Sequence, residues 1–329
     1  MIRFILRKTY YFKFYCPLPL NDKIKSWFFL ISLSIIWGSS FLLIKIALMD
    51  NNGIMRLSPD VLASLRLSLA FLFLSPLIFK YCRKIKKADL PYFLISGFLG
   101  NGIPSFLFAY AELKISSAVA GMLNSLVPVF TIVIAAVFFS FAWKIKHIIG
   151  ILTGILGTCL IVFKFNQPEQ ISTPILPILM VLAGSLCYAI SLNIIKYKLQ
   201  HLHPNLITSV SFLFVGIPSL FYLLSTDFYG LILIGEISNE ALIAVFLLAL
   251  IGTSLAVLVF NRLIKISSPV FTSSITYLIP IVAVVFGVFY GENISSQQII
   301  GLFTLLLGVL IINVKKPFHR IKQVFIFGK

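Results

Sequence analysis

The sequence predicts an all-α integral membrane protein whose ten transmembrane helices form two inverted five-helix repeats. Three observations support this prediction: the composition, ten long apolar stretches and an internal duplication. Of the 329 residues, 59% are hydrophobic and 11% are charged, and the mean hydropathy is +1.04. A soluble domain carries roughly 25% charged residues, so this composition excludes a soluble enzyme, a disordered chain and a disulfide scaffold.

The apolar stretches are long enough to cross a bilayer, because a transmembrane helix needs about 20 mostly apolar residues. An even number of spans places both termini on the same side of the membrane. The stretches cover residues 27–48, 60–79, 90–111, 117–139, 147–163, 175–195, 205–225, 241–261, 268–290 and 297–314.

The distribution of basic residues predicts which side that is. The chain has 27 Lys and Arg residues against 10 Asp and Glu residues, a net charge of +17. If the termini and the even-numbered loops are cytoplasmic, the outer loops carry only Arg56, Lys114 and Lys164, and the spans only Lys45 and Arg66. Basic residues collect on the cytoplasmic side of membrane proteins. We therefore expect a multi-pass protein of the cell membrane with both termini cytoplasmic, in contact with the lipid bilayer and with no nucleic-acid partner.

Four segments follow from this reading. We expect a basic cytoplasmic tail at residues 1–26, repeats at residues 27–165 and 175–314, and a second basic tail at residues 315–329. The first tail lacks the apolar core and cleavage site of a signal peptide. It is either a solvated tail or an arm that lies on anionic lipid headgroups.

The two repeats are recognised by self-comparison. The run KISS at residues 114–117 recurs at residues 265–268, an offset of 151 residues, and the same offset relates Gly157 to Gly308. Each half holds five spans, and an odd number forces the second copy to enter the membrane from the opposite side. Inverted repeats are typical of secondary transporters, because nearly symmetric halves can adopt two mirror-related states open to opposite sides.

Two parts of the chain resemble a known family. The first repeat opens with IIWGSSFLLIKIAL (35–48) and LSPDVLASLRLSLAFLF (57–73), and the second ends with TYLIPIVAVVFGVFYGENISSQQIIGLFTLLLGVLII (276–312). These runs resemble the EamA-type branch of the drug/metabolite transporter superfamily over about residues 27–314. The resemblance implies ten helices in two inverted repeats with a substrate cavity between them. One departure is that the Gly291-Glu292 turn is replaced by Ser140-Phe141 in the first repeat.

Two prolines at matching positions point to the substrate site. Pro128 and Pro280 fall inside predicted spans, where each removes a backbone donor and frees the carbonyl four residues earlier, on Asn124 and Thr276. Such carbonyls avoid lipid and face protein or a polar cavity. Paired interrupted helices in corresponding positions are typical of transporter binding sites. The alternative is a pair of packing kinks without a ligand.

Polar and aromatic residues at similar depth complete the predicted site. Trp37 and Tyr188 are related by the duplication and are expected to form aromatic walls, with core packing as the alternative. The polar residues form a cavity or only join helices by hydrogen bonds. The predicted substrate-binding residues are Trp37, Asn101, Asn124, Ser125, Pro128, Tyr188, Asn193, Thr253, Ser273, Thr276, Tyr277 and Pro280.

Charges in the outer half of the membrane form a second candidate group, Lys45, Arg66 and Glu112. A charge at a helix centre costs about 2.5–3.5 kcal/mol on insertion scales, so the two cations need a reason to be there. They either extend to the membrane surface or pair with an acid, or they form an outer gate or a contact for a substrate carboxylate or phosphate. Glu112 and Glu292 fall at outer ends of spans, so we expect that proton coupling does not use an acid at a span centre. The candidate acidic partners are Asp50, Asp60 and Glu112.

The remaining motifs carry no chemistry of their own. His201 and His203 lie in a basic loop without further ligands, so neither a metal site nor a cofactor is expected. No catalytic signature occurs in a suitable context, so we do not expect an enzyme. We predict a secondary transporter that moves a small organic metabolite, such as an amino acid, a related metabolite or a drug-like compound, by alternating access. The resemblance implies a path lined by spans 1, 3, 4, 6, 8 and 9. The alternative is a non-transporting membrane scaffold or lipid-handling module, and the sequence leaves the oligomeric state open while being compatible with a monomer.

Overall fold

The computed structural model describes residues 20–50, 52–81, 85–142, 144–163, 175–228, 237–267, 271–272 and 274–313. Within these ranges the chain is helical and holds no β-strand, apart from an isolated bridge between Met49 and Met55. The prediction of an all-α protein is confirmed. Most of the two predicted tails, residues 1–19 and 314–329, lies outside the described residues.

The first half of the chain contains helices that end at polar or glycine-containing turns. Several of them follow one another with almost no break and together form one membrane-length segment, as from Lys87 to Glu112. The elements are α1 (Leu20–Leu48), α2 (Pro59–Tyr81), η3 (Lys87–Asp89), α3 (Leu90–Gly97), η4 (Phe98–Gly102), α4 (Ile103–Glu112), α5 (Ser117–Asn124), α6 (Val127–Phe138) and α7 (Ile145–Val162).

The second half has a similar order in its described part, without counterparts of η3 and α5. Its elements are α8 (Ile175–Lys198), α9 (Pro204–Ser225), α11 (Asn239–Ala249), η5 (Leu250–Leu255), α12 (Ala256–Ile266), α14 (Ile275–Phe289) and α15 (Ser296–Asn313). Among the described residues, nine segments are long and apolar enough to cross a membrane, and α14 is a shorter apolar helix.

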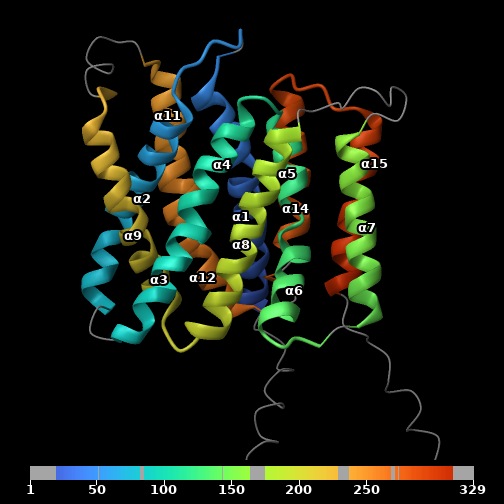
Figure 1. The fold of residues 1–329 in the computed structure, drawn as a ribbon, viewed down its shortest axis with the longest axis horizontal. Helices are drawn as coiled ribbons and strands as arrows, with labels where there is room; N and C mark the ends of the chain where they lie inside the picture. The colour runs from blue at the N-terminus through green and yellow to red at the C-terminus, as the bar shows by residue number, and fades with distance from the viewer. Residues whose placement is uncertain are drawn as a thin grey trace, which may run out of the picture.

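The helices stand side by side and roughly parallel, and successive segments run in opposite directions (Figure 1). Their outer faces carry large apolar side chains, among them Phe138 at 71% exposure, Phe289 at 86% and Phe303 at 62%. In water such a surface would drive association. Lipid removes this penalty, so the exposed apolar faces identify a membrane protein.

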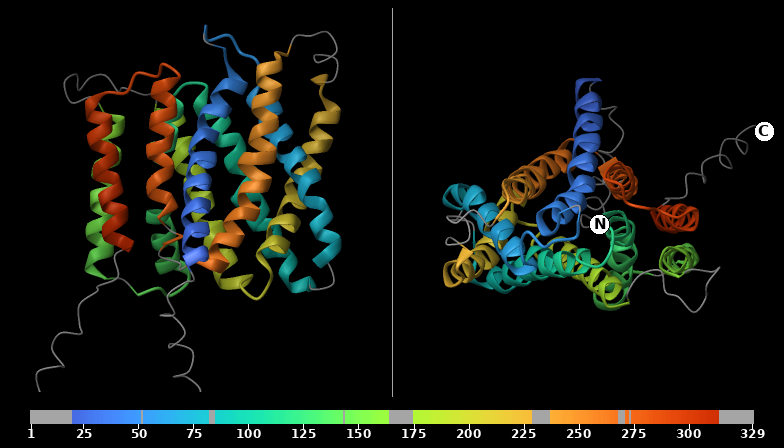
Figure 2. Two further views of the ribbon diagram at one scale, coloured as in Figure 1. Left: turned by 180° about the vertical axis from the view of Figure 1, so that it is seen from behind. Right: turned by 90° about the horizontal axis from the view of Figure 1, so that it is seen from above.

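Helices from the two halves pack against each other in a symmetric pattern. The pair α2 and α9 lies at one edge of the molecule and the pair α7 and α15 at the other (Figures 1 and 2). Between them, the contact of α1 with α14 has its counterpart in the contact of α8 with α6, and the contact of α2 with α11 has its counterpart in that of α9 with α3. These contacts between described elements are therefore related by an exchange of the two halves.

Glycines bring the backbones of α7 and α15 into contact. A Cβ atom added to Gly157 would lie 2.7 Å from the carbonyl oxygen of Gly301, and one added to Gly308 would lie 2.6 Å from that of Gly150. Small residues allow membrane helices this close approach. Because Gly150 is opposite Gly308 and Gly157 is opposite Gly301, the two helices run antiparallel.

The turns after α6 and α14 share an unusual backbone. Gly291 has φ +89° and Ser140, which precedes it by 151 residues, has φ +53°. A left-handed conformation is free of strain for glycine but costs an ordinary residue about 1–2 kcal/mol. The first repeat therefore keeps the shape of the Gly291-Glu292 turn although its residues differ.

Candidate functional site

One π-helical segment interrupts the third membrane-length helix of each half. They are η4, Phe98–Gly102, and η5, Leu250–Leu255, and the offset of 151 places residues 98–102 at 249–253. A π-helical turn inside an α-helix is rare and is found frequently at functional sites. The predicted site residues Asn101 and Thr253 lie in these two segments.

Each π-helical segment packs closely against the first helix of the other half. A Cβ atom added to Gly252 would lie 2.9 Å from the hydroxyl oxygen of Ser40, and one added to Gly100 would lie 2.5 Å from that of Ser191. Ser40 and Ser191 are themselves 151 residues apart. The contact between the halves is thus built twice, each time from a glycine and a serine.

The predicted aromatic residues lie beside these contacts. The indole N–H of Trp37 donates to the carbonyl of Gly252 at 3.1 Å, and its ring packs on Phe260 with centroids 5.2 Å apart. The ring of Tyr188 stacks on Phe108 at 6.0 Å. Both predicted rings are half-buried.

The two predicted prolines act differently. Pro128 follows a break between α5, which ends at Asn124, and α6, which begins at Val127. Pro280 lies inside the continuous helix α14 and is buried. Only the first proline coincides with an interruption of the helix.

The remaining predicted polar residues make hydrogen bonds between or within helices. Asn124 accepts from the Ser185 hydroxyl at 3.3 Å, and the buried Asn193 amide donates to the Thr131 carbonyl at 3.0 Å. The Ser125 hydroxyl turns back to the Met122 carbonyl. The Tyr277 hydroxyl donates to Val309 on α15 at 3.2 Å, while Thr276 is half-buried on α14 and Ser273 lies outside the described residues.

The charged group lies where α1, α2 and α4 meet. The Lys45 amine donates to the carbonyl oxygens of Glu112 at 2.6 Å and Ile115 at 3.2 Å, at the C-terminal end of α4. The Arg66 Nε donates to the Thr253 hydroxyl at 3.1 Å. Arg66 and Lys45 both lie within electrostatic range of the Glu112 carboxylate.

The acids considered as partners have other contacts. Asp60 accepts from the Tyr110 hydroxyl at 2.8 Å, and Asp50 accepts from the backbone N–H groups of Asn52 at 2.9 Å and Ile54 at 2.7 Å. The two cations therefore bind backbone carbonyls and a hydroxyl. They lie near the Glu112 carboxylate without a hydrogen bond to it.

One functional contact was not anticipated from the sequence. The Glu292 carboxylate, in the turn after α14, accepts from the backbone N–H groups of Ser117 at 2.7 Å and Ala118 at 3.0 Å. These groups begin α5, whose N-terminus attracts a negative charge. A residue of the second half thereby holds a helix of the first half, and the Gly-Glu turn was the signal available in the sequence.

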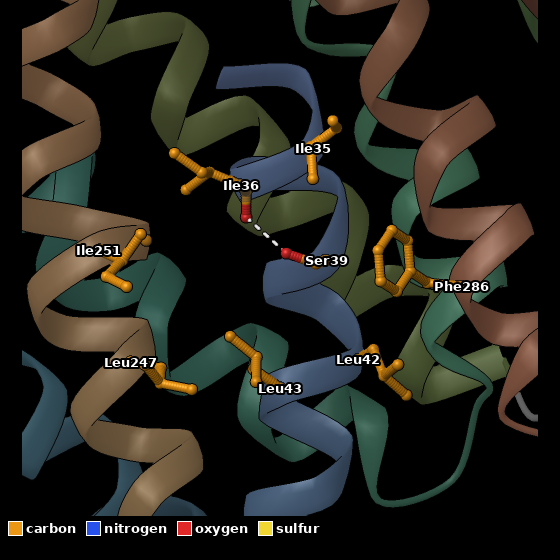
Figure 3. Close-up of a pocket in the computed structure, with 9 residues that line it drawn as sticks. Ile35, Ile36, Ser39, Leu42, Leu43, Leu247, Ile251 and Phe286 are labelled. Atoms are coloured by element: carbon orange, nitrogen blue, oxygen red, sulfur yellow. Dashed lines mark hydrogen bonds between the residues drawn. The ribbon is translucent and has the colours of Figure 1, made fainter. Parts of the chain in front are cut away.

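Two cavities lie beside α1. One of about 290 Å³ lies between α1 and the segment α11–η5, and its lining is almost entirely apolar (Figure 3). The Ser39 hydroxyl in it is bonded to the Ile36 carbonyl at 3.1 Å. Another, of about 330 Å³, lies at the end of α1 and is lined by Lys45, Met49, Asp50, Gly53, Tyr290, Gly291 and Glu292.

The EamA-like transporter family matches the chain twice, over residues 24–163 and 175–314. The chain belongs to the EamA-like transporter family. It is a multi-pass membrane protein, and the resemblance seen in the sequence is confirmed. The two matched segments meet at the contacts described above.

Individual relatives agree with this assignment. An uncharacterized inner membrane transporter, YedA, of Escherichia coli strain K12 is 25% identical over 296 residues, which cover 90% of this chain and 92% of the relative. An uncharacterized transporter of Archaeoglobus fulgidus is 28% identical over 194 residues, which cover 59% of this chain and 66% of the relative, slightly under two thirds. A solved crystal structure shares the fold, with a TM-score of 0.55 at 13% identity over 87% of this chain and 96% of the other.

Proposed function

We propose that this protein is a secondary transporter that moves a small organic metabolite across the cell membrane by alternating access. Membership of the EamA-like family and a relative named as an inner membrane transporter support this proposal. The symmetric packing of the two halves supports the mechanism, since alternating access exchanges the conformations of two similar halves around a central site.

The packing of α7 against α15 carries the proposal. Gly150 and Gly157 correspond to Gly301 and Gly308 in the repeat, and the helices that hold them are antiparallel. Two copies of one helix that run in opposite directions belong to repeats of opposite orientation. With ten spans, such repeats place both termini on the same side, and the distribution of basic residues indicates that this side is cytoplasmic.

This topology predicts opposite membrane faces for two equivalent positions, Lys114 and Lys265. Single cysteines placed at Lys114 and at Lys265, in a chain without its native cysteines, are expected on the outer and the inner face respectively. A membrane-impermeant thiol reagent applied to intact cells then labels residue 114 and leaves residue 265 unlabelled until the cells are opened. Labelling of both positions from outside would overturn the inverted arrangement.

The contacts between the halves suggest where the substrate binds. Small-molecule sites combine apolar or aromatic walls with a few convergent polar groups. Trp37 and Tyr188 supply the walls, the π-helical segments with Asn101 and Thr253 supply irregular backbone, and Asn124 lies at the break between α5 and α6. We assign the substrate path to the contact surface between the helices that carry the predicted substrate-binding residues, and we call this surface the seam.

Transport is tested with purified protein in liposomes and a panel of radiolabelled amino acids, nucleosides and small organic acids. We expect saturable flux of at least one compound, absent from empty liposomes. If no compound of the panel moves, and the purified protein instead retains a protein partner or transfers lipid, the scaffold or lipid-handling alternative replaces this proposal.

The site assignment predicts a loss of transport from two substitutions together, Asn124→Leu and Thr276→Leu. Two bulky apolar side chains at the seam are expected to lower the initial rate about tenfold or more, equivalent to about 1.4 kcal/mol. The matched control is Asn239→Leu, at an exposed position on α11, with Thr153→Leu, at a half-buried position on α7, both outside the seam. Equal membrane levels and equal rates in the two double variants would remove the seam assignment.

A further inference from the structure

The carboxylate of Glu112 lies in an unusual environment. Glu112 is the last residue of α4 and its side chain is 0% exposed. Neither of its carboxylate oxygens has a hydrogen-bond partner within the described part of the chain. Burying an ionised carboxylate without hydrogen bonds is far more costly than burying the neutral acid.

The neighbouring cations do not relieve this cost directly. Lys45 directs its amine to the Glu112 and Ile115 carbonyls, and Arg66 directs its Nε to Thr253. Both positive charges lie within electrostatic range of Glu112, as does the negative charge of Glu292. Tyr188, on the packed helix α8, lies within range of Arg66. Helix α5, which also contacts α4, contains no titratable residue.

We propose that Glu112 is a proton-binding site, and that it holds a proton in this conformation. The enclosure of the group selects a proton over a larger cationic ligand, because its oxygens have no accessible surface. The cavity of about 330 Å³ that reaches Lys45 and Glu292 does not have Glu112 in its lining. A substrate ammonium in this cavity therefore does not reach the carboxylate in this state.

The second part of the proposal rests on the proposed transport function. In the state open to the other side, separation of the halves breaks the contact of Arg66 with Thr253 of the second half, and the Arg66 guanidinium turns to the Glu112 carboxylate. The carboxylic acid then loses its proton to water, the carboxylate is stabilised by the cation, and the cation keeps its charge. Returning to the described conformation takes one proton from the other side, so transport is coupled to proton movement. The sequence led us to expect that proton coupling does not use an acid at a span centre, and this inference assigns it to an acid that is buried at the end of α4.

Infrared spectroscopy tests the proton site without any substrate. The purified full chain at pH 7 is expected to show a carbonyl stretch from a protonated carboxyl group, which is lost in Glu112→Gln. The matched control, Glu240→Gln, changes an exposed carboxylate paired with Arg56 and is expected to keep this band. A wild-type spectrum without such a band, or the same band in Glu112→Gln, overturns the proposal. The Glu112→Asp variant, which retains a carboxyl group, is expected to retain the band and guards against misfolding of the first variant.

Proteoliposomes test the coupling with whichever compound of the panel moves. For one proton per substrate, a gradient of one pH unit is expected to change the steady-state accumulation about tenfold in the wild type. Glu112→Gln is expected to equilibrate the compound without responding to the gradient. Wild-type accumulation that ignores the gradient, or an unchanged response in Glu112→Gln, overturns coupling and leaves the transport function intact. Absence of flux in every condition rejects the transport function instead, and the infrared result still decides the proton site.

Discussion

Replacing Gly157 by alanine is expected to lower the free energy of unfolding by about 1–3 kcal/mol, the usual cost of overpacking. A Cβ atom at this position would lie 2.5 Å from the backbone nitrogen of Leu305 and 2.7 Å from the Gly301 carbonyl oxygen. Both atoms belong to the backbone of α15, so they cannot move aside as a flexible side chain does. The helices α7 and α15 must separate, which removes dispersion contacts along their whole interface.

Gly154 on the same helix provides the matched control. A Cβ atom there would lie 3.5 Å from a methyl group of Val129, an ordinary contact. Because alanine favours a helix over glycine by about 1 kcal/mol, Gly154→Ala is expected to be neutral or stabilising. Thermal unfolding of both variants in detergent micelles checks the opposite signs. Equal stability of the two variants would show that the glycines do not set the distance between α7 and α15.

The overall class of the fold could be predicted because it depends on composition and on the length of apolar runs. The duplication could be predicted because it leaves matching residues such as Gly157 and Gly308 at one offset. The π-helical segments could not, because the difference in energy between an α-turn and a π-turn is small and is decided by neighbours. Here those neighbours are Ser40 and Ser191, whose closeness to the glycines appears only after the halves are packed.

In the candidate site too, some features could be predicted from the sequence and others depend on how the helices pack. Pro128 was informative because proline breaks a helix through its own covalent structure, and α6 does begin beside it. Pro280 shows the limit of this rule, since α14 continues through it. The burial of Glu112 could not be predicted from its place at the end of a helix. Its exposure depends on α1, α2 and α8, which pack against α4, and Lys45 of α1 bonds to its backbone carbonyl.

Replacing Glu292 by alanine is expected to lower the free energy of unfolding by about 3 kcal/mol. A hydrogen bond to a charged group contributes about 1.5–3 kcal/mol, and Glu292 accepts two, from Ser117 and Ala118. Both donors belong to residues that are fully buried, so their N–H groups would be left without a partner. The start of α5 would also lose the negative charge that favours a helix N-terminus. The midpoint of thermal unfolding measures the loss.

The two hydrogen bonds of Glu292 form a bridge between the turn after α14 and the start of α5. Two further variants distinguish the contribution of this bridge to stability from the effect of removing any negative charge. Gly287→Ala keeps Glu292 but would place a Cβ atom 2.5 Å from its Oε2, and is therefore expected to displace the carboxylate and destabilise the protein in the same direction. Glu240→Ala removes an acid that is 69% exposed and paired with Arg56, and is expected to cost about 0–1 kcal/mol. A loss in Glu240→Ala as large as that in Glu292→Ala would contradict the bridge. Since Ser140-Phe141 offers no carboxylate at the equivalent turn, this turn has no such bridge within the described residues. The Glu292 bridge therefore favours the conformation in which the N-terminus of α5 and the C-terminus of α14 are joined.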